Sequence, residues 1–482
     1  MTIKRREFLK IVGTGISLTA LGCVSSSKKE LSAKPNFILC MADDQGWGDM
    51  AYNGHPVLKT PNFDEAAVSG LRFDRFYAAS PVCSPTRGNV LTGRHPNRFG
   101  CFQWGYSLRP QEISLAEVLK TAGYVCGHFG KWHLGSVLAD SPVNPGAFGF
   151  DEWFSSPNFF DNNPILSRRG TAVKTYGEGS MVTVDAALAF IRKHAARPNP
   201  FLAVIWFGSP HRPHEAEESD CALYPEQRKN LQHFYGEITA MDRAFGTLRK
   251  ELRNLGIENN TLLWYCSDNG GLEGLSRTGG RGHKSNIYEG GLRVPAFIEW
   301  PSQIPIRKNS SLPCSTSDIF PTLLDILEIE RENQLPLDGI SLYPLITNAL
   351  DRRQKPIGFW DYPAKGISTP SHKLMTELLD AQIQGKNIDD PSRLRLDAGE
   401  ITIQYPEDPF PGHSAWLDWP WKLHRIQDDK GLAEWELYNL EQDPMEQNNL
   451  KDKYPNRNIL MRSSLEKWLV SVVRSLNGKD YS

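Results

Sequence analysis

The chain has 482 residues, of which 54 are Lys or Arg and 56 are Asp or Glu, so its formal net charge is −2. This balance, without a basic stripe interleaved with aromatic residues, excludes the charge pattern typical of nucleic-acid-binding proteins. Hydrophobic residues make up 40% of the chain and charged residues 23%, which is typical of a globular protein. The length predicts a large domain and a smaller one.

The N-terminus carries the pattern of an export signal. Lys4-Arg5-Arg6 precedes an apolar run at residues 11–21, an arrangement that resembles a twin-arginine signal. The run closes with Ala20-Leu21-Gly22-Cys23, which resembles a lipoprotein cleavage box, so Cys23 is expected to carry lipid as the mature N-terminus. A plain cleaved signal and a simple anchor are the alternatives. Residues 1–34 are therefore interpreted as a signal and tether.

These features predict the location of the protein. The apolar run is too short for an ordinary membrane-spanning helix, and no later stretch approaches that length. We therefore expect an exported bacterial protein that is either periplasmic or a membrane-anchored lipoprotein. Membrane attachment is expected only through a lipid on Cys23.

Four continuous apolar runs, each followed by a polar or glycine-rich loop, lie at residues 37–41, 124–129, 201–207 and 262–266. Runs of this kind favour strands that are buried on both faces, as in a parallel sheet. Between them, apolar residues spaced three or four apart from Tyr235 to Leu252 indicate a core-facing helix. The alternation predicts an α/β sandwich, in which ligands bind at the carboxyl ends of the strands.

The pattern changes near residue 350. Residues 364–415 are polar and irregular, which indicates a surface insertion. Residues 421–426 and 435–438 resemble strands, and a helix is expected at about 456–476, with an apolar stripe through Leu460, Leu465, Leu469 and Val472. The C-terminal part is therefore expected to be a small antiparallel sheet with one packed helix.

Two acidic pairs follow predicted strands. Asp43 and Asp44 come after the first run, and Asp268 and Asn269 come after the last of the four. Their oxygen atoms are suited to a hard divalent cation. Each pair alone is more often a turn. Both follow buried strands, however, and together they indicate a metal site.

The segment Cys83-Ser84-Pro85-Thr86-Arg87 resembles the activation signature of type I sulfatases, in the alkaline-phosphatase-like superfamily. A lone cysteine is usually just a small buried hydrophobic residue. Residues 41–46, 267–271 and 436–444 also resemble sulfatase segments, so the resemblance covers roughly residues 35–450 in order. It implies a catalytic domain at 35–350, with a large mixed, mostly parallel sheet, and a smaller C-terminal α+β subdomain at 351–482.

The resemblance implies two cofactors. In this family the cysteine matching Cys83 is oxidised to formylglycine by a formylglycine-generating maturation enzyme. The expected metal ligands are Asp43, Asp44, Asp268 and Asn269, with Cys83 as formylglycine. The family implies calcium, and the ligand types do not exclude magnesium. Residues 84–91 can open a helix whose N-terminus would stabilise anions at this position.

Five further residues match the catalytic and sulfate-binding positions of the family. Lys131 and Lys284 match lysines that bind sulfate, and Arg87 could reach the hydrated aldehyde as a fixed cation. In the implied mechanism, the aldehyde hydrate attacks sulfur, and His211, together with Lys284, protonates the departing alcohol. The second hydroxyl of the hydrate then loses its proton to His133 and expels sulfate.

The substrate is expected to be a sulfated polysaccharide or its oligosaccharides. Trp360, His413, Trp416 and Trp419 are candidates for the rim of the site, with core packing as the alternative. His283 is a candidate substrate contact, whereas His214 is interpreted as structural. Two other functions remain open: a phosphatase or phosphodiesterase with a Ser or Thr nucleophile, or a non-catalytic lipoprotein that binds sulfated glycans.

Overall fold

Residues 33–428 and 430–481 are described by the computed structural model. The predicted signal, including Cys23, lies outside them. The first predicted strand is β1 (Asn36–Ala42), which is apolar and buried at every position except Asn36. It pairs in parallel with β7 (Phe201–Trp206) on one side and with β8 (Thr261–Ser267) on the other. The apolar runs of the sequence are thus central strands, as predicted.

β1 belongs to a large sheet whose described strands have the order β10-β2-β9-β8-β1-β7-β3-β4-β5-β6, with β11 beside β2. The five strands from β8 to β4 are parallel, whereas β9, β5 and β6 run antiparallel to their neighbours. The predicted mixed, mostly parallel sheet is therefore confirmed. The other strands are β2 (Leu71–Tyr77), β3 (Val125–Lys131), β4 (Glu152–Ser156), β5 (Ile165–Arg168), β6 (Thr171–Lys174), β9 (Arg293–Glu299), β10 (Lys308–Ser310) and β11 (Cys314–Ser315).

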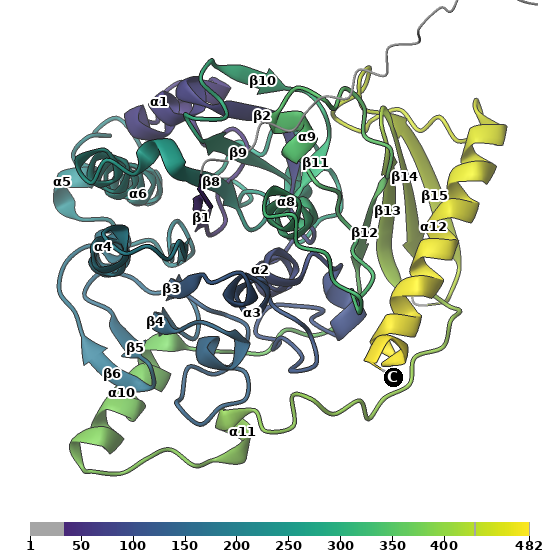
Figure 1. Cartoon of the computed structure of the whole chain (residues 1–482). Coiled ribbons are helices and arrows are strands. Elements are labelled where there is room, and N and C mark those ends of the chain that lie inside the picture. Colours follow the sequence, from purple (N-terminus) through teal and green to yellow (C-terminus); the bar gives the residue numbers. More distant parts are fainter. Residues whose placement is uncertain (1–32, 429, 482) are drawn as a thin grey trace, which may run out of the picture. The chain divides into compact units, whose positions relative to one another are not determined.

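Helices cover both faces of this sheet (Figure 1). α1 (Pro61–Ser69), α4 (Gly179–Ala195) and α6 (Lys229–Asn254) lie on one side, and α2 (Cys83–Thr92), α3 (Leu115–Thr121) and α8 (Ile319–Ile326) lie on the other. The apolar positions predicted between Tyr235 and Leu252 are all buried in α6. The short helices are α5 (Glu218–Cys221), α7 (Glu289–Leu292) and α9 (Tyr343–Ile346).

The C-terminal part forms a second, four-stranded antiparallel sheet, with strand order β12-β13-β14-β15. Its strands are β12 (Ile357–Asp361), β13 (Gly412–Asp418), β14 (Trp421–Gln427) and β15 (Ala433–Asn439). The helix α12 (Pro455–Leu476) packs on one face of this small sheet (Figure 1). The predicted antiparallel sheet with one packed helix is confirmed.

The buried stripe of α12 differs from the predicted one at its first position. Leu460 is 70% exposed, and Met461 takes the inward place beside Leu465 and Leu469. Met461, Leu465, Leu469 and Val472 are spaced four, four and three apart, which keeps them on one helix face. Leu460 precedes Met461 by one residue, so its side chain points about 100° away from that of Met461 around the helix axis and leaves the buried face.

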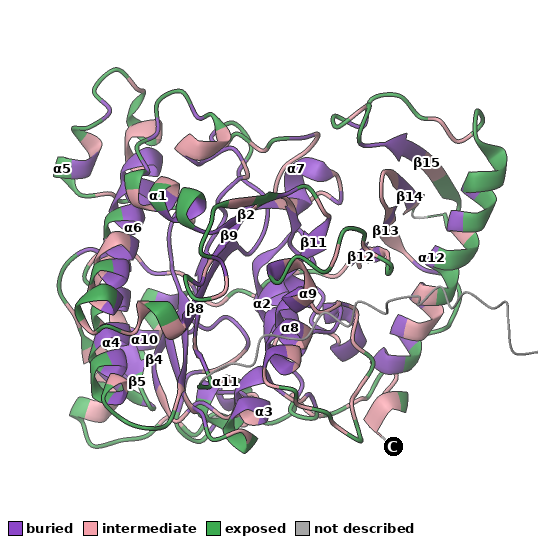
Figure 2. Cartoon of the chain, turned by 45° about the horizontal axis from the view of Figure 1, so that its top comes forward, coloured by how far each residue is buried: buried purple, intermediate pink, exposed green. Residues whose placement is uncertain are grey.

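The predicted insertion is more ordered than expected. The connection between β12 and β13, which we call the crossing segment (residues 362–411), contains α10 (Ser371–Ile383) and α11 (Pro391–Leu394). α10 returns to the large sheet, where the Gln382 side chain accepts a hydrogen bond from the Ala172 backbone at 2.8 Å. Met375 and Leu378 of α10 are buried, while many of its polar residues face outward (Figure 2).

Of the four residues proposed for a substrate rim, Trp360, Trp416 and Trp419 make packing contacts, and the His413 ring bonds to that of His424 at 2.9 Å. Trp360 is 2% exposed and lies in the apolar cluster that α12 covers, so it cannot form a rim. Trp416 packs against Trp468, with ring centroids 5.9 Å apart. The guanidinium of Arg75 lies 3.9 Å from the ring centroid of Trp419. Packing was the alternative interpretation of these residues.

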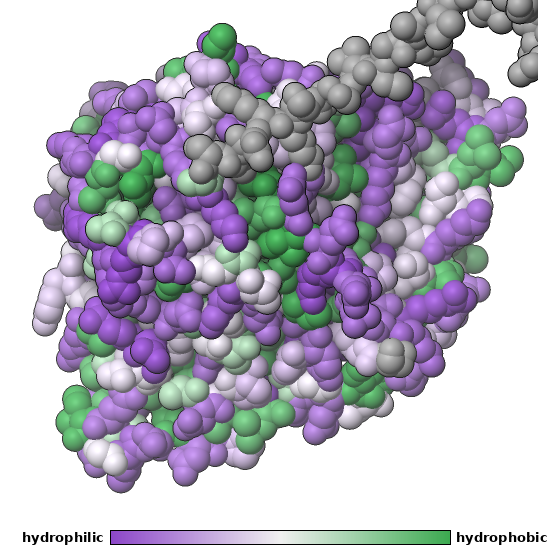
Figure 3. Space-filling model, viewed as in Figure 1, coloured by the Kyte–Doolittle hydropathy of each residue, from purple (hydrophilic) through white to green (hydrophobic). Residues whose placement is uncertain are grey.

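The surface is mainly polar on the face shown in Figure 3, where apolar residues occur in scattered patches. Among the described residues, no helix combines the length and apolar character that crossing a membrane requires.

Candidate active site

The register of the two central strands brings both acidic pairs to one place. Ala42 of β1 lies opposite Ser267 of β8, so the residues that follow the two strands emerge side by side. The Asp44 backbone N–H donates to Oδ1 of Asp268 at 3.1 Å. Asp44 has a φ of 72°, a left-handed conformation that is uncommon for residues other than glycine. Strained residues of this kind concentrate at functional sites.

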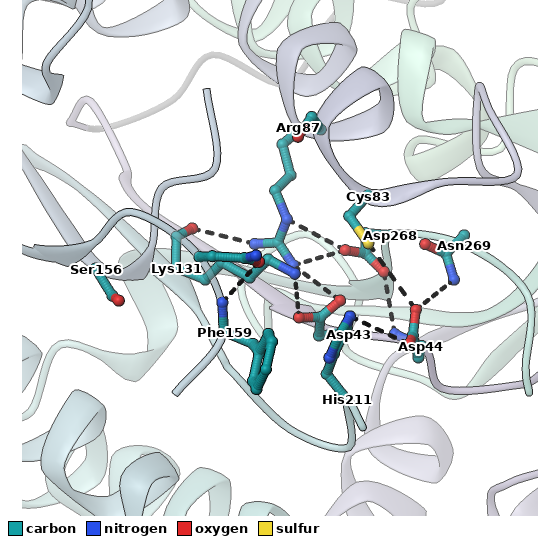
Figure 4. Close-up of polar contacts among 12 residues, drawn as sticks. Asp43, Asp44, Cys83, Arg87, Lys131, Ser156, Phe159, His211, Asp268 and Asn269 are labelled. Carbon is teal, nitrogen blue, oxygen red and sulfur yellow. Dashed lines mark hydrogen bonds and ion pairs between the residues drawn. The ribbon is translucent and has the colours of Figure 1, made fainter. Parts of the chain in front are cut away.

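Cys83 is the first residue of α2 and lies against the acidic pairs (Figure 4). Its Sγ atom is 4.0 Å from Oδ1 of Asp44, and the residue is 1% exposed. Val82, which precedes it, makes no side-chain cap, so backbone N–H groups of the first turn remain available for an anion. Burial raises the pKa of the Cys83 thiol above its usual range, although Lys131 and Lys284 oppose the rise. The unmodified thiol is therefore not a ready nucleophile.

Arg87, one turn further along α2, is fully buried and holds the cluster together. It donates to Oδ2 of Asp268 from Nε at 3.1 Å and from Nη2 at 2.6 Å, and to the Lys131 carbonyl at 3.2 Å. Its Nη2 atom also lies 3.7 Å from Oδ1 of Asp43. The main partner of this fixed cation is thus a carboxylate of the cluster.

Two lysines point their charges at the aspartates that follow β1. Nζ of Lys131, the last residue of β3, lies 2.5 Å from Oδ2 of Asp43. Nζ of Lys284 lies 2.6 Å from Oδ1 and 2.7 Å from Oδ2 of Asp44. Burial would lower the pKa of Lys284, but Asp44 outweighs it and keeps the pKa above its usual value. Burial would likewise raise the pKa of Asp44, yet Lys284 and His211 hold it low. Lys284 is therefore charged at neutral pH.

The two predicted histidines have different surroundings. Neither ring nitrogen of His133 has a hydrogen-bond partner in the described part of the chain, although the residue is buried and has a left-handed φ of 53°. Burial, reinforced by Lys131 and Arg87, holds the pKa of His133 well below its usual value. An unpaired buried imidazole is a costly arrangement that points to a functional role.

His211 lies at the more open side of the cluster, with a side chain that is 19% exposed. Its Nδ1–H donates to the Arg212 carbonyl at 2.6 Å, which leaves Nε2 facing Oδ2 of Asp44 at 3.8 Å. Burial lowers the pKa of His211 to about 3, although Asp44 opposes this effect. The ring stacks on Phe159, with centroids 4.2 Å apart. No sequence pattern had marked Phe159, which lies in the loop after β4.

The cluster fits a hard divalent cation. Oδ1 of Asp43 and Oδ1 of Asn269 are buried oxygens without a hydrogen-bond partner in the described residues. The Asn269 amide donates to Asp44 at 2.9 Å, which fixes the orientation of its free oxygen. Potential ligand atoms of Asp43, Asp44, Cys83 and His211 all lie within 4.8 Å of one another. Asp268 is also within this network, and burial, reinforced by Asp43, raises its pKa to about 6. Carboxylate and amide oxygens are the ligands that calcium and magnesium prefer.

The structure therefore brings the predicted site residues together. Direct contacts join nine of them: Asp43, Asp44, Cys83, Arg87, Lys131, His211, Asp268, Asn269 and Lys284. His133 lies within electrostatic reach of Lys131 and His211. His214 bonds to the Pro210 carbonyl at 3.0 Å. His283 bonds to the Lys284 carbonyl and lies 3.5 Å from Glu273, away from the cluster carboxylates.

Comparisons with known proteins agree with this geometry. The family model described as Sulfatase matches residues 35–329. The chain is 32% identical to the N-acetylgalactosamine-6-sulfatase of Mus musculus over 372 residues, which cover 68% of each protein. It is 31% identical to the ulvan-active sulfatase of Formosa agariphila over 361 residues, which cover 69% of this chain and 70% of that protein.

A solved structure shares the fold. The complex of Ps i-CgsB with k-i-k-neocarrahexaose superimposes with a TM-score of 0.74 and 24% identity, covering 90% of this chain and 93% of that one. Because the alignment leaves out only a small share of this chain, it includes residues of both the large sheet and the small C-terminal sheet.

Proposed function

Because the chain belongs to the sulfatase family, we propose that it removes sulfate from a sulfated carbohydrate by means of a formylglycine made from Cys83. One observation carries the proposal. The Cys83 side chain lies at the N-terminus of α2, against Asp44, which pairs with Lys284, while Lys131 pairs with the adjacent Asp43. Here Sγ occupies the place of the oxygen atoms of a hydrated aldehyde. Positive charge therefore surrounds the position at which a sulfate ester would be attacked.

A carbohydrate substrate is supported by the relatives. The curated proteins include an N-acetylgalactosamine-6-sulfatase and an ulvan-active sulfatase, and a solved structure of the same fold holds a neocarrahexaose. We infer a sulfated oligosaccharide or polysaccharide as the substrate class of this chain. The N-terminal signal pattern supports export, where such polymers would be met, with a lipid on Cys23 as the proposed anchor.

Asp43, Asp44, Asp268 and Asn269 would hold a divalent cation, for which we propose calcium, with magnesium as the other candidate. The two buried oxygens without hydrogen bonds, on Asp43 and Asn269, support this assignment. Such a cation, when bound, would polarise the sulfate group through one of its oxygens. The formylglycine, made by a maturation enzyme of the exporting cell, would supply a nucleophilic hydroxyl.

The side chains of the chain itself would do the remaining work. Lys131 and Lys284 approach the cluster and would bind sulfate oxygens, which lowers the cost of bringing an anion to a nucleophile. Arg87 would hold Asp268 in place and add positive charge near position 83. The unpaired ring of His133 would accept the proton of the second hydroxyl at position 83, the one that does not attack sulfur.

His211 would protonate the leaving alcohol from Nε2. Burial keeps the pKa of His211 low, so the ring is neutral at pH 7 before substrate binds. A bound sulfate group adds negative charge close to Nε2, and a nearby negative charge favours the protonated imidazole. Substrate binding would thus prepare the acid that the reaction needs, with the stacked Phe159 holding the ring in place.

The test uses protein produced together with a formylglycine-generating enzyme. We expect release of inorganic sulfate from N-acetylgalactosamine 6-sulfate and from 4-nitrophenyl sulfate, and its loss in Cys83→Ala. Faster hydrolysis of 4-nitrophenyl phosphate than of the sulfate would instead indicate a phosphatase. If position 83 keeps its thiol in the presence of that enzyme and no sulfate is released, the non-catalytic glycan-binding alternative is favoured.

A further inference from the structure

The crossing segment lies directly beside the candidate active site. Asn158 donates from its side chain to the carbonyl and hydroxyl oxygens of Thr369, at 3.1 and 3.0 Å. Asn158 precedes Phe159, whose ring stacks on His211. The hydroxyl of Ser156, the last residue of β4, donates to that of Ser371 at 3.0 Å. The start of α10 is therefore tied to the carboxyl end of a strand that borders the site.

A second contact reaches the activation signature itself. The Gly105 N–H donates to the hydroxyl of Ser84, the residue after Cys83, at 2.9 Å. Ile367 of the crossing segment donates to the Trp104 carbonyl at 2.9 Å. A Cβ atom on Gly105 would lie only 1.9 Å from the Ile367 carbonyl oxygen, so the two backbones touch where only glycine fits. The crossing segment therefore packs against the loop that contacts Ser84, next to Cys83.

Between this segment and the loop after β3 lies a cavity of about 190 Å³. It is lined by Gly105, by Gly135 two residues beyond His133, by apolar side chains such as Val137 and Leu374, and by Arg395. Pockets for drug-sized ligands span roughly 300–1,000 Å³, so this volume suits a single sugar unit or its substituent. We call it the Arg395 cavity.

Arg395 is unusual in both conformation and charge. Its φ is 57°, a left-handed conformation that carries a steric cost for any residue with a Cβ atom. Its guanidinium has no hydrogen-bond or ion-pair partner among residues 33–428 and 430–481, whereas the neighbouring Arg393 pairs with Glu377 at 3.0 Å. Burial raises the pKa of Tyr106, and the charge of Arg395 opposes that rise. This places the guanidinium within electrostatic reach of the loop that contacts Ser84.

We propose that the Arg395 cavity is a subsite for the sugar next to the sulfated one, and that Arg395 binds an oxyanion on that sugar. A partly enclosed, unpaired guanidinium is a strong ligand for a carboxylate or a sulfate, because its N–H groups match both oxygens. The apolar wall would pack against the C–H face of the sugar ring. This inference rests on the proposed function, since it places the neighbouring sugar relative to a sulfate bound at Cys83. Such a subsite makes the enzyme selective for oligosaccharides that carry a second negative charge.

Arg395→Asn is the test variant, because asparagine tolerates the left-handed conformation while it removes the cation. Arg395→Lys keeps the charge, and Arg457→Asn, which removes an exposed arginine from α12, is the matched control. Binding is measured by calorimetry on Cys83→Ala protein, which cannot turn over. The probes are N-acetylgalactosamine 6-sulfate alone, the same sugar linked to a uronic acid, and the same sugar linked to a neutral sulfated sugar. The last two probes separate carboxylate from sulfate recognition.

We expect Arg395→Asn to weaken the binding of one or both charged disaccharides by roughly tenfold or more, since bonds to charged groups have this strength. Binding of the monosaccharide should not change, Arg395→Lys should recover part of the loss, and Arg457→Asn should have no effect. Equal affinities of Arg395→Asn and the parent protein for both disaccharides would overturn the inference, as would an equal loss for the monosaccharide. A sulfate-release assay on the unmutated enzyme is run alongside. An Arg395-dependent affinity without sulfate release would support the subsite and contradict the proposed function. Sulfate release with an affinity that does not depend on Arg395 would support the proposed function and contradict the subsite.

Discussion

Arg87 donates two hydrogen bonds to a single oxygen of Asp268, and both side chains are wholly buried. The other oxygen of Asp268 accepts the backbone N–H of Asp44. The pair therefore connects α2, which carries Cys83, to the loops after β1 and β8. This pair holds Cys83 close to the residues that we propose as ligands of the cation.

We expect Arg87→Gln to lower the free energy of unfolding by about 3–5 kcal/mol, because removal of one partner leaves a buried carboxylate uncompensated. Urea unfolding followed by circular dichroism measures the effect. Arg474→Gln is the control, since Arg474 pairs with Glu407 on the exposed surface and its loss should leave stability unchanged within error. Equal stabilities of the two variants would contradict the role given to Arg87.

Conversion of Cys83 should precede folding. The residue is 1% exposed and all of α2 is buried, so a modifying enzyme cannot reach the thiol in the folded protein. We expect mass spectrometry of the tryptic peptide 76–87 to show aldehyde after co-production with the maturation enzyme. Folded protein carrying the thiol should remain unconverted when the same enzyme is added later. A synthetic peptide spanning residues 76–95 is the positive control, and efficient conversion of the folded protein would disprove this order of events.

Removal of the cation should lower both activity and stability. Calcium added back to chelator-treated protein at 100 times its Kd should raise the free energy of unfolding by about 2.7 kcal/mol, the value for a ligand that binds only the folded state. Asn269→Ala removes one of the two buried oxygens that lack a hydrogen bond, so it should shift this calcium titration to higher concentrations. Asn259→Ala, an exposed control, should not. Repeating the titration with magnesium identifies the preferred ion.

The effect of His211→Ala should depend on the leaving group. A sugar alcohol leaves poorly without a proton, so we expect kcat to fall by roughly 10²–10⁴ for N-acetylgalactosamine 6-sulfate. 4-Nitrophenolate leaves readily, so 4-nitrophenyl sulfate should lose much less. His214→Ala is the matched control, because His214 contacts the Pro210 carbonyl and has no assigned catalytic role. The same loss for both esters would assign His211 to binding rather than proton transfer.

Asp361 gives the small sheet a pH dependence. Burial raises its pKa to about 7, although a hydrogen bond from Gln103 at 2.8 Å opposes the rise. The usual value is about 3.9, so between about pH 4 and pH 7 the folded state binds more protons at this site than the unfolded state. The stabilisation that protonated Asp361 gives the folded state is therefore fully present below pH 4 and is lost as the pH rises through 7. In urea unfolding at pH 5 and pH 7.5, Asp361→Asn should show a smaller loss of stability than the parent protein, and an identical loss would argue against it.

Several parts of the fold and the site could be read from the sequence because they depend on local pattern. The apolar runs identified β1, β3, β7 and β8, since a strand buried on both faces consists almost entirely of apolar residues. Asp43, Asp268 and Lys131 could be assigned to one site because the carboxyl ends of parallel strands meet at one edge of a sheet. The chemistry of Cys83 came from its resemblance to a family signature, since its environment cannot be seen in one sequence.

Other features depend on which residue meets which, and the sequence alone does not carry that information. Periodicity marks a buried side but does not name the partner, so the pairing of Arg87 with Asp268, the stacking of Phe159 on His211 and the inward turn of Met461 emerged only in three dimensions. The crossing segment is polar because much of it faces solvent, yet its backbone is ordered by contacts with residues more than 200 positions away, such as Asn158 with Thr369. Local composition determined the strands and the reactive groups. Long-range packing decided the partners of those groups and placed Arg395 in the same cavity wall as Gly105, which contacts Ser84.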